Sequence, residues 1–142
     1  MVESKKETFA LVIENRNTTV RGLSFALESH GIRTRRARSL REAEEIMKKS
    51  EPPRLVFTDA LLADGTWLDV VRLANRRART AKVVVVSPTA DTRLYLEALE
   101  GGAFDCVAPP FAGVDLPHVV SCALRPESRR PQPAGRAMYA SS

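Results

Sequence analysis

Four polar residues of the sequence directly follow apolar runs, and their types fit the binding of a cation or a reaction at phosphorus. Glu14 and Asn15 end one run, Asp59 ends a second and Ser87 ends a third. Carboxylate and amide oxygens suit a hard divalent cation such as Mg²⁺, which takes one or two carboxylates and keeps several waters. A carboxylate in this setting can also attack phosphorus to give an aspartyl phosphate. Polar residues at strand ends often only begin loops, so it is the convergence of these residues that favours a site.

The elements that would position these residues alternate between short apolar runs and amphipathic segments. The predicted strands are 9–13, 32–37, 55–59, 82–87 and 106–108, and the predicted helices are 18–30, 39–49, 67–77, 91–100 and 116–124. Strands that alternate with helices predict a parallel sheet with helices on both faces. The functional site of such a sheet forms at the carboxyl ends of its strands. Ser39 and Glu42 add a capping-box pattern at the start of the second helix.

The composition is that of one globular domain. The chain has 142 residues, 44% of them hydrophobic, with 22 Lys and Arg against 17 Asp and Glu. This length suffices to bury a core without metals or disulfides. The segment 125–142 accounts for three of the five net positive charges. The arginines within 33–41 have no aromatic residues among them, so we interpret them as a solvated edge strand and expect no nucleic-acid partner.

The sequence also predicts the surroundings of the protein and its domain limits. No apolar run approaches the roughly 20 residues of a membrane helix, and the first residues lack a signal-peptide core. Cys106 and Cys122 are too few for a disulfide scaffold. We therefore expect a soluble, reduced, cytoplasmic protein without membrane contact. The expected parts are an N-terminal extension at 1–8, a domain at 9–124 and a disordered basic tail at 125–142.

The ordered combination of these motifs resembles the receiver domain of two-component response regulators over nearly all of residues 9–124. The segment 55–65 is similar to the third strand, acceptor aspartate and following loop of that family, and 102–111 is similar to its last signature segment. The resemblance implies a flavodoxin-like, doubly wound, five-stranded parallel sheet of order 2-1-3-4-5 with helices on both faces. It also implies that Asp59 is the phospho-acceptor and that Ser87 senses the phosphoryl oxygens.

The resemblance further implies a Mg²⁺ site, and this sequence departs from it. The implied ligands are Glu14, Asn15, Asp59 and the backbone carbonyl of Leu61. Asn15 stands where the family has a second acid, so one anionic ligand has become neutral. We therefore predict that the Mg²⁺ site is weak or empty.

Two further departures affect what happens after phosphorylation. Pro109 stands where the family has a lysine, and proline has no donor for the phosphoryl group. The lost charge-assisted hydrogen bond is worth roughly 1.5–3 kcal/mol. Cys106 stands at the position of the family's switch aromatic. We also expect a cis peptide bond between Pro109 and Pro110, and we expect Tyr95 on an exposed face used for partners.

Two functions remain open at this stage. The leading one is a stand-alone receiver of a two-component phosphorelay, which accepts a phosphoryl group on Asp59 and is not an enzyme. Its partners would be a histidine kinase or phosphotransfer protein, a downstream protein and, as an option, a second copy of the chain. The alternative is a degenerate pseudo-receiver that binds proteins independently of phosphorylation. A small flavodoxin-like enzyme would need a cofactor pocket that the sequence does not show.

Overall fold

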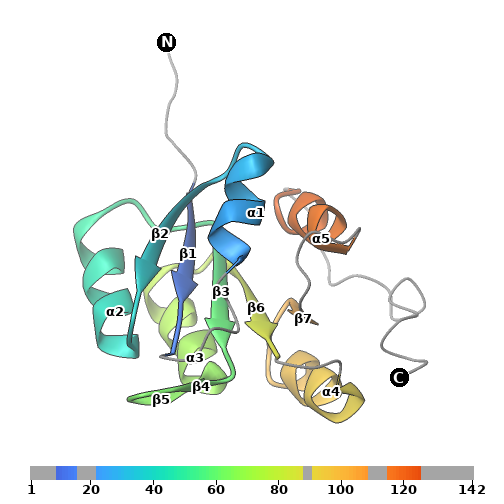
Figure 1. Ribbon diagram of the computed structural model, residues 1–142. Coiled ribbons are helices and arrows are strands. Elements are labelled where there is room, and N and C mark those ends of the chain that lie inside the picture. The colour runs from blue at the N-terminus through green and yellow to red at the C-terminus, as the bar shows by residue number, and fades with distance from the viewer. Residues whose placement is uncertain (1–8, 16–21, 88–90, 109–114, 126–142) are drawn as a thin grey trace.

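The domain is built on one five-stranded parallel sheet (Figure 1). The computed structural model describes residues 9–15, 22–87, 91–108 and 115–125. The strands of the sheet are β1 (Phe9–Ile13), β2 (Arg33–Ala37), β3 (Leu55–Asp59), β6 (Lys82–Val86) and β7 (Asp105–Val107). Their order is β2-β1-β3-β6-β7. Because β6 and β7 are the fourth and fifth strands of the sheet, this is the predicted order 2-1-3-4-5, and the fold prediction is confirmed.

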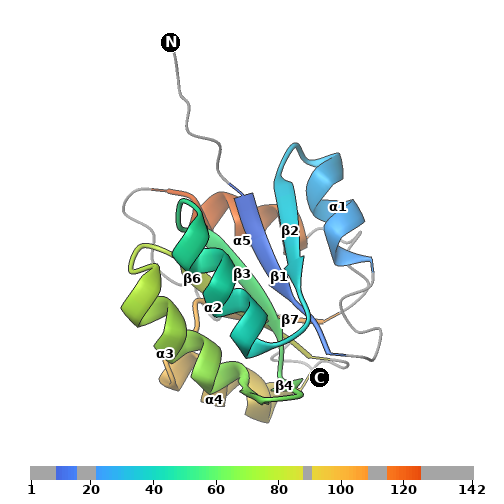
Figure 2. The ribbon, with the colours of Figure 1, turned by 90° about the vertical axis from the view of Figure 1, so that its left-hand side faces the viewer.

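Helices cover both faces of the sheet, which leaves one core on each side. They are α1 (Leu23–Ser29), α2 (Leu40–Lys49), α3 (Trp67–Arg77), α4 (Thr92–Glu100) and α5 (Asp115–Ala123). Figure 1 and Figure 2 show α1 and α5 on one face and α2 and α3 on the other. One core holds buried residues of α1 and α5, and the other holds buried residues of α2, α3 and α4. The predicted helix 18–30 is described only from residue 22 onward.

The central strands are apolar on both sides, as strands between two helical layers must be. Every residue of β1 and of β3 is buried, whereas β2 at the sheet edge is mostly exposed. The parallel registers align Ile13 with Thr58 and Asp59 with Val86. The carboxyl ends of β1, β3 and β6 therefore lie at one edge of the sheet.

Side-chain caps begin the helices on the α2 and α3 side. The Ser39 hydroxyl accepts a hydrogen bond from the Glu42 N–H at 3.0 Å. The Glu42 carboxylate accepts from the Arg38 N–H at 2.8 Å rather than from Ser39, so the reciprocal half of the predicted box is shifted by one residue. Thr66 and Asp69 form a full capping box at the start of α3. These bonds satisfy N–H groups that a helix start leaves without partners.

A short hairpin stands where the sequence predicted only a loop between Asp59 and α3. It consists of β4 (Leu61–Leu62) and β5 (Gly65–Thr66), which pair antiparallel. The Asp64 carboxylate at its tip accepts from the Leu40 N–H at 2.8 Å and the Arg41 N–H at 3.0 Å. A side chain on Gly65 would meet the Asp69 carboxylate at 2.7 Å, so a larger residue there would have to displace the side chain that caps α3. The hairpin thereby ties the segment after Asp59 to the start of α2.

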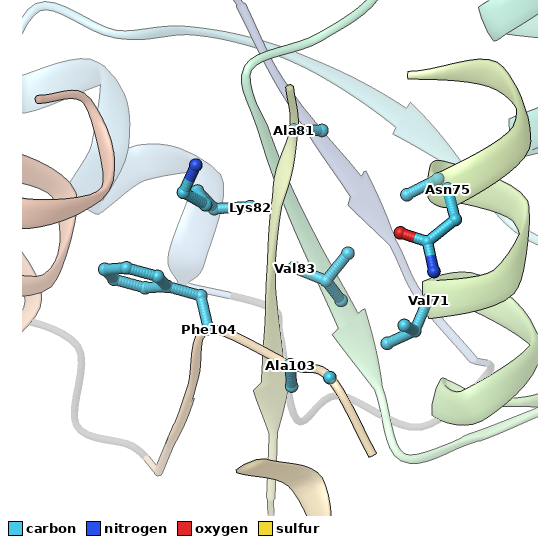
Figure 3. Close-up of a pocket in the computed structure, with 9 residues that line it drawn as sticks. Val71, Asn75, Ala81, Lys82, Val83, Ala103 and Phe104 are labelled. Carbon is cyan, nitrogen blue, oxygen red and sulfur yellow. The ribbon is translucent and has the colours of Figure 1, made fainter. Parts of the chain in front are cut away.

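A pocket of about 190 Å³ lies at the opposite end of β6 (Figure 3). In the close-up, Val71 and Asn75 of α3 point toward β6, from which Val83 points back toward them. Lys82 and Phe104 line the other side of the strand. Lys82 begins β6 and stands four residues, roughly 13 Å, from its carboxyl end. The pocket is therefore separate from the edge that carries Asp59.

Several expectations lie outside the described residues. These are the N-terminal extension, the basic tail beyond residue 125, and Pro109 with its peptide bond to Pro110. Within the described part of the chain, every helix is too short or too polar to cross a membrane.

Candidate functional site

Asp59 is the buried acid at the carboxyl edge of the sheet. It ends β3, and its side chain and backbone together are only 3% exposed. Asn15 lies two residues after the end of β1, the strand that pairs with β3. Its backbone N–H donates to Asp59 Oδ2 at 2.6 Å. Among the described residues, no hydrogen bond reaches Oδ1. One carboxylate oxygen is thus fixed by the backbone of Asn15, just after β1, while the other receives no hydrogen bond from the described residues.

The environment of Asp59 disfavours its negative charge. Burial raises the pKa of Asp59 above its ordinary value, and the nearby Glu14 charge raises the pKa further. The hydrogen bond from the Asn15 backbone lowers the pKa but does not offset the burial. The described residues therefore leave the charge of Asp59 under-compensated.

The neighbours of Asp59 are engaged with groups of this chain. The Asn15 side-chain Nδ2 donates to the Leu61 carbonyl at 3.0 Å. The Glu14 carboxylate pairs with Arg36 of β2, with 2.7 Å between Oε2 and Nη2. The structure therefore brings Asn15, Asp59 and Leu61 into one hydrogen-bonded group and directs Glu14 to Arg36.

These oxygens do not fit a tightly bound Mg²⁺ as they stand. Mg²⁺ requires octahedral oxygen ligands at 2.0–2.1 Å. The Leu61 carbonyl and Asp59 Oδ2 both accept from Asn15, and the Glu14 carboxylate is already paired with Arg36. In the part of the chain that the structure describes, no group of three or more His, Cys, Asp or Glu side chains could hold a metal.

Ser87 and Cys106 lie at the other half of the same edge. Ser87 directly follows β6, is 2% exposed, and donates its backbone N–H to the Val107 carbonyl at 2.8 Å. Asp59 pairs with Val86, so Ser87 is one residue beyond the level of Asp59. Cys106 is a free, buried cysteine on β7. The buried setting fits a small apolar residue at this position.

The expected exposure of Tyr95 is wrong. Tyr95 is 4% exposed and belongs to the same core as Cys106. It shares a helix face with Ala98 and Leu99, three and four residues further on, and that face packs on the sheet. Leu96 is instead the large apolar residue of α4 that is exposed, at 51%. The helical spacing with Ala98 and Leu99 is the signal that could have located Tyr95 inside.

Two side-chain contacts of the edge strand β2 were missed from the sequence. Arg36 was expected only as part of a solvated strand, yet it pairs with Glu14 because β1 and β2 align Val12 with Arg36. Arg35 lies over the Phe9 ring at 5.5 Å, so an aromatic partner comes from the neighbouring strand rather than from the arginine cluster itself. Both contacts depend on the parallel register of β1 and β2, which hydrophobic periodicity alone does not specify.

The family of the chain follows from sequence comparison. Residues 10–121 match the response regulator receiver domain, and the chain belongs to this family. Receiver domains are signalling domains that interact with histidine kinases and generally bind Mg²⁺ in an acidic pocket. The resemblance stated from the motifs is therefore confirmed.

Individual relatives are longer than this chain. Response regulator protein PilR of Pseudomonas aeruginosa is 31% identical over 116 residues, which are 82% of this chain and 26% of PilR. Acid tolerance regulatory protein ActR of Rhizobium meliloti is 27% identical over 131 residues, which are 92% of this chain and 65% of ActR. The chain thus spans less than two thirds of either relative.

Solved structures share the fold. A response regulator from Thermotoga maritima is 24% identical with a TM-score of 0.68, covering 82% of this chain and 97% of that chain. A Burkholderia pseudomallei response regulator with a phosphorylated aspartic acid, calcium ion and citrate is 20% identical with a TM-score of 0.63. That match covers 94% of this chain and 73% of the Burkholderia chain.

Proposed function

We propose that this receiver domain accepts a phosphoryl group on Asp59 and passes the signal on through protein–protein contacts. The observation that carries the proposal is the asymmetric setting of the Asp59 carboxylate. Oδ2 is held by the Asn15 N–H at 2.6 Å, and Oδ1 receives no hydrogen bond from the described residues. A carboxylate with one fixed and one unengaged oxygen is oriented for attack by the unengaged oxygen.

The reaction that we propose transfers a phosphoryl group from an oxygen or nitrogen atom of a donor to a carboxylate oxygen of Asp59. Oδ1 forms a bond to phosphorus while the bond from phosphorus to the donor breaks, and the electron pair of that bond leaves with the donor. The product is an acyl phosphate on Asp59. The donor would be a phosphohistidine of a histidine kinase or phosphotransfer protein, with neutral histidine as the leaving group after proton uptake.

The output side of the proposal rests on exposed apolar side chains. Phe25 of α1 is 78% exposed, Leu61 of β4 is 66% exposed and Leu96 of α4 is 51% exposed. These three side chains lie on three different elements, and each offers apolar surface that a bound partner would cover. We propose a cytoplasmic domain that binds a downstream protein, with a second copy of the chain as another partner.

A second candidate is a pseudo-receiver whose binding surface is independent of phosphorylation. Cys106 favours it, because a small buried residue occupies the place of the family's switch aromatic. Without that ring, phosphorylation of Asp59 has one side chain fewer through which it could change the surface of the domain. In this alternative the receiver fold is retained only as a scaffold for contacts.

Phosphorylation by a small donor separates the two candidates. Acetyl phosphate should add the mass of one phosphoryl group to the purified chain, read by intact mass in buffers with and without Mg²⁺. Asp59→Ala should abolish the gain, whereas Asp64→Ala, which removes an exposed acid of the hairpin, should retain it. Asn15→Asp combined with Pro109→Lys should raise the rate and the extent. Failure of both the natural and the restored chain to gain mass would establish the pseudo-receiver.

A further inference from the structure

The residue Asn15 joins two segments that are far apart in the sequence and adjacent at the sheet edge. Its backbone N–H donates to Asp59 Oδ2 at 2.6 Å, and its side-chain Nδ2 donates to the Leu61 carbonyl at 3.0 Å. These partners are 44 and 46 residues further along the chain. Asn15 therefore forms a two-point clasp between the end of β1 and the segment that follows β3.

The chemistry of this clasp depends on an amide rather than an acid. The Leu61 carbonyl can only accept hydrogen bonds, so the amide nitrogen must face it. An aspartate at position 15 has the same shape but only acceptors, and its carboxylate would repel the Leu61 carbonyl. Such a pair of acceptors needs a cation between them. The asparagine makes the same link with its own N–H group.

A second contact, between Arg36 and Glu14, balances the other negative charge that a cation would otherwise have to balance. Glu14 is the other acid beside Asp59, and its side chain is 13% exposed. The guanidinium of Arg36 lies 2.7 Å from the Glu14 carboxylate, while the rest of the Arg36 side chain is largely in solvent. The positive charge near this acid is thus supplied by β2.

We propose that Asn15, assisted by Arg36, takes over the bridging role of a divalent cation, so that the edge around Asp59 keeps its geometry without metal. Mg²⁺ has to displace the Asn15 amide from Leu61 and compete with Arg36 for Glu14. The inference concerns the site of the proposed function, but it does not require Asp59 to be phosphorylated. Its readouts are metal binding and stability, so its failure is distinct from failure of the phosphorylation assay.

The test compares Mg²⁺ responses of single-residue variants. Thermal unfolding and fluorescence of the single Trp67, whose backbone N–H donates to the Ala60 carbonyl at 3.0 Å, are followed in zero to about 20 mM MgCl₂ at constant ionic strength. The natural chain should show no specific response to Mg²⁺. Asn15→Asp should unfold at a lower temperature without Mg²⁺, recover with it, and bind at least about tenfold more tightly than the natural chain.

Two further variants serve as control and as a second line of the test. Asn75→Asp on α3 adds the same charge at an exposed position of another element and should gain no Mg²⁺ response. Arg36→Ala should gain a weaker response than Asn15→Asp, because it frees Glu14 and leaves the Asn15 clasp intact. The proposal is overturned if the natural chain responds to Mg²⁺ as strongly as Asn15→Asp. It is also overturned if Asn15→Asp without Mg²⁺ is as stable as the natural chain.

Discussion

The two halves of the carboxyl edge of the sheet differ in the side chains and hydrogen bonds that they contain. The acceptor half, at the ends of β1 and β3, holds Asp59 in a network with Asn15 and Leu61. The relay half, at the ends of β6 and β7, has Ser87 beside a buried Cys106. In the acceptor half, a backbone donor holds the Asp59 carboxylate in place although the neighbouring residue 15 is an amide rather than an acid. In the proposed function, a signal passing through this half would need a side chain that changes its position, and the small, buried Cys106 is poorly suited to that.

The largest expected effect concerns an aromatic ring of α4, the helix that packs against β7 of the relay half. Tyr95 is 4% exposed and shares a core with Cys106. Tyr95→Ala should lower the free energy of unfolding by about 3–5 kcal/mol, as for other buried aromatic side chains. Tyr95→Phe, which keeps the ring, should cost at most about 1.5 kcal/mol. Urea unfolding measures the free energy of unfolding of both variants. If Tyr95→Ala loses less stability than Tyr95→Phe, the ring does not contribute to the core.

Restoring an aromatic residue at Cys106 should cost stability in the natural background. Cys106→Phe adds volume to a filled core and should destabilise the fold by about 1–3 kcal/mol. Combined with Tyr95→Ala, the new ring should recover part of the loss, because α4, which carries Tyr95, packs against β7, which carries Cys106. A double-mutant cycle of urea unfolding measures this coupling. Simple additivity of the two changes would show that the side chains at positions 95 and 106 are not coupled.

A smaller effect is expected where the hairpin supports the acceptor half. Asp64 caps the first N–H groups of α2, those of Leu40 and Arg41. Asp64→Ala should lower the free energy of unfolding by about 1 kcal/mol. Asp64→Asn keeps an acceptor oxygen and should lose less. Equal losses for the two variants in urea unfolding would exclude the hydrogen bonds as the cause.

The smallest expected effect is a pH dependence that belongs to Asp59. Burial raises the pKa of Asp59 in the folded state above its ordinary value of 3.8. An acid with a raised folded-state pKa binds its proton more tightly when folded, so stability falls as the pH rises from 3.8 through that raised pKa. Asp59→Asn should flatten this part of the stability profile, measured by urea unfolding across acid pH. An unchanged profile would assign the dependence to other groups.

The sequence predicted the fold because its signals are local and repeated. Apolar runs such as Val83–Val86 and the helical spacing of 67–77 indicate their elements without knowledge of distant contacts. The hairpin after Asp59 was not predicted, because two-residue strands have no periodicity to detect. The register of β1 with β2 was also needed to connect Arg36 with Glu14.

The candidate site could be predicted only as a set of positions. The carboxyl-edge rule brought Glu14, Asn15, Asp59 and Ser87 together, but it assigned no hydrogen-bond partners. The donation from Asn15 to the Leu61 carbonyl depends on the conformation of the segment after β3. The weak Mg²⁺ site was predicted from a missing charge alone. The structure adds a physical competitor for that cation, which is the amide of the same residue.

The most direct test of the difference between the halves is a map of amide chemical shifts before and after treatment with acetyl phosphate and Mg²⁺. Changes should be concentrated at Asn15, Asp59, Leu61 and Trp67 and should be small at Tyr95 and Cys106. Changes of equal size across β7 and α4 would contradict the loss of the relay. Absence of change at Asp59 and its neighbours, with the domain folded, would contradict the acceptor half itself.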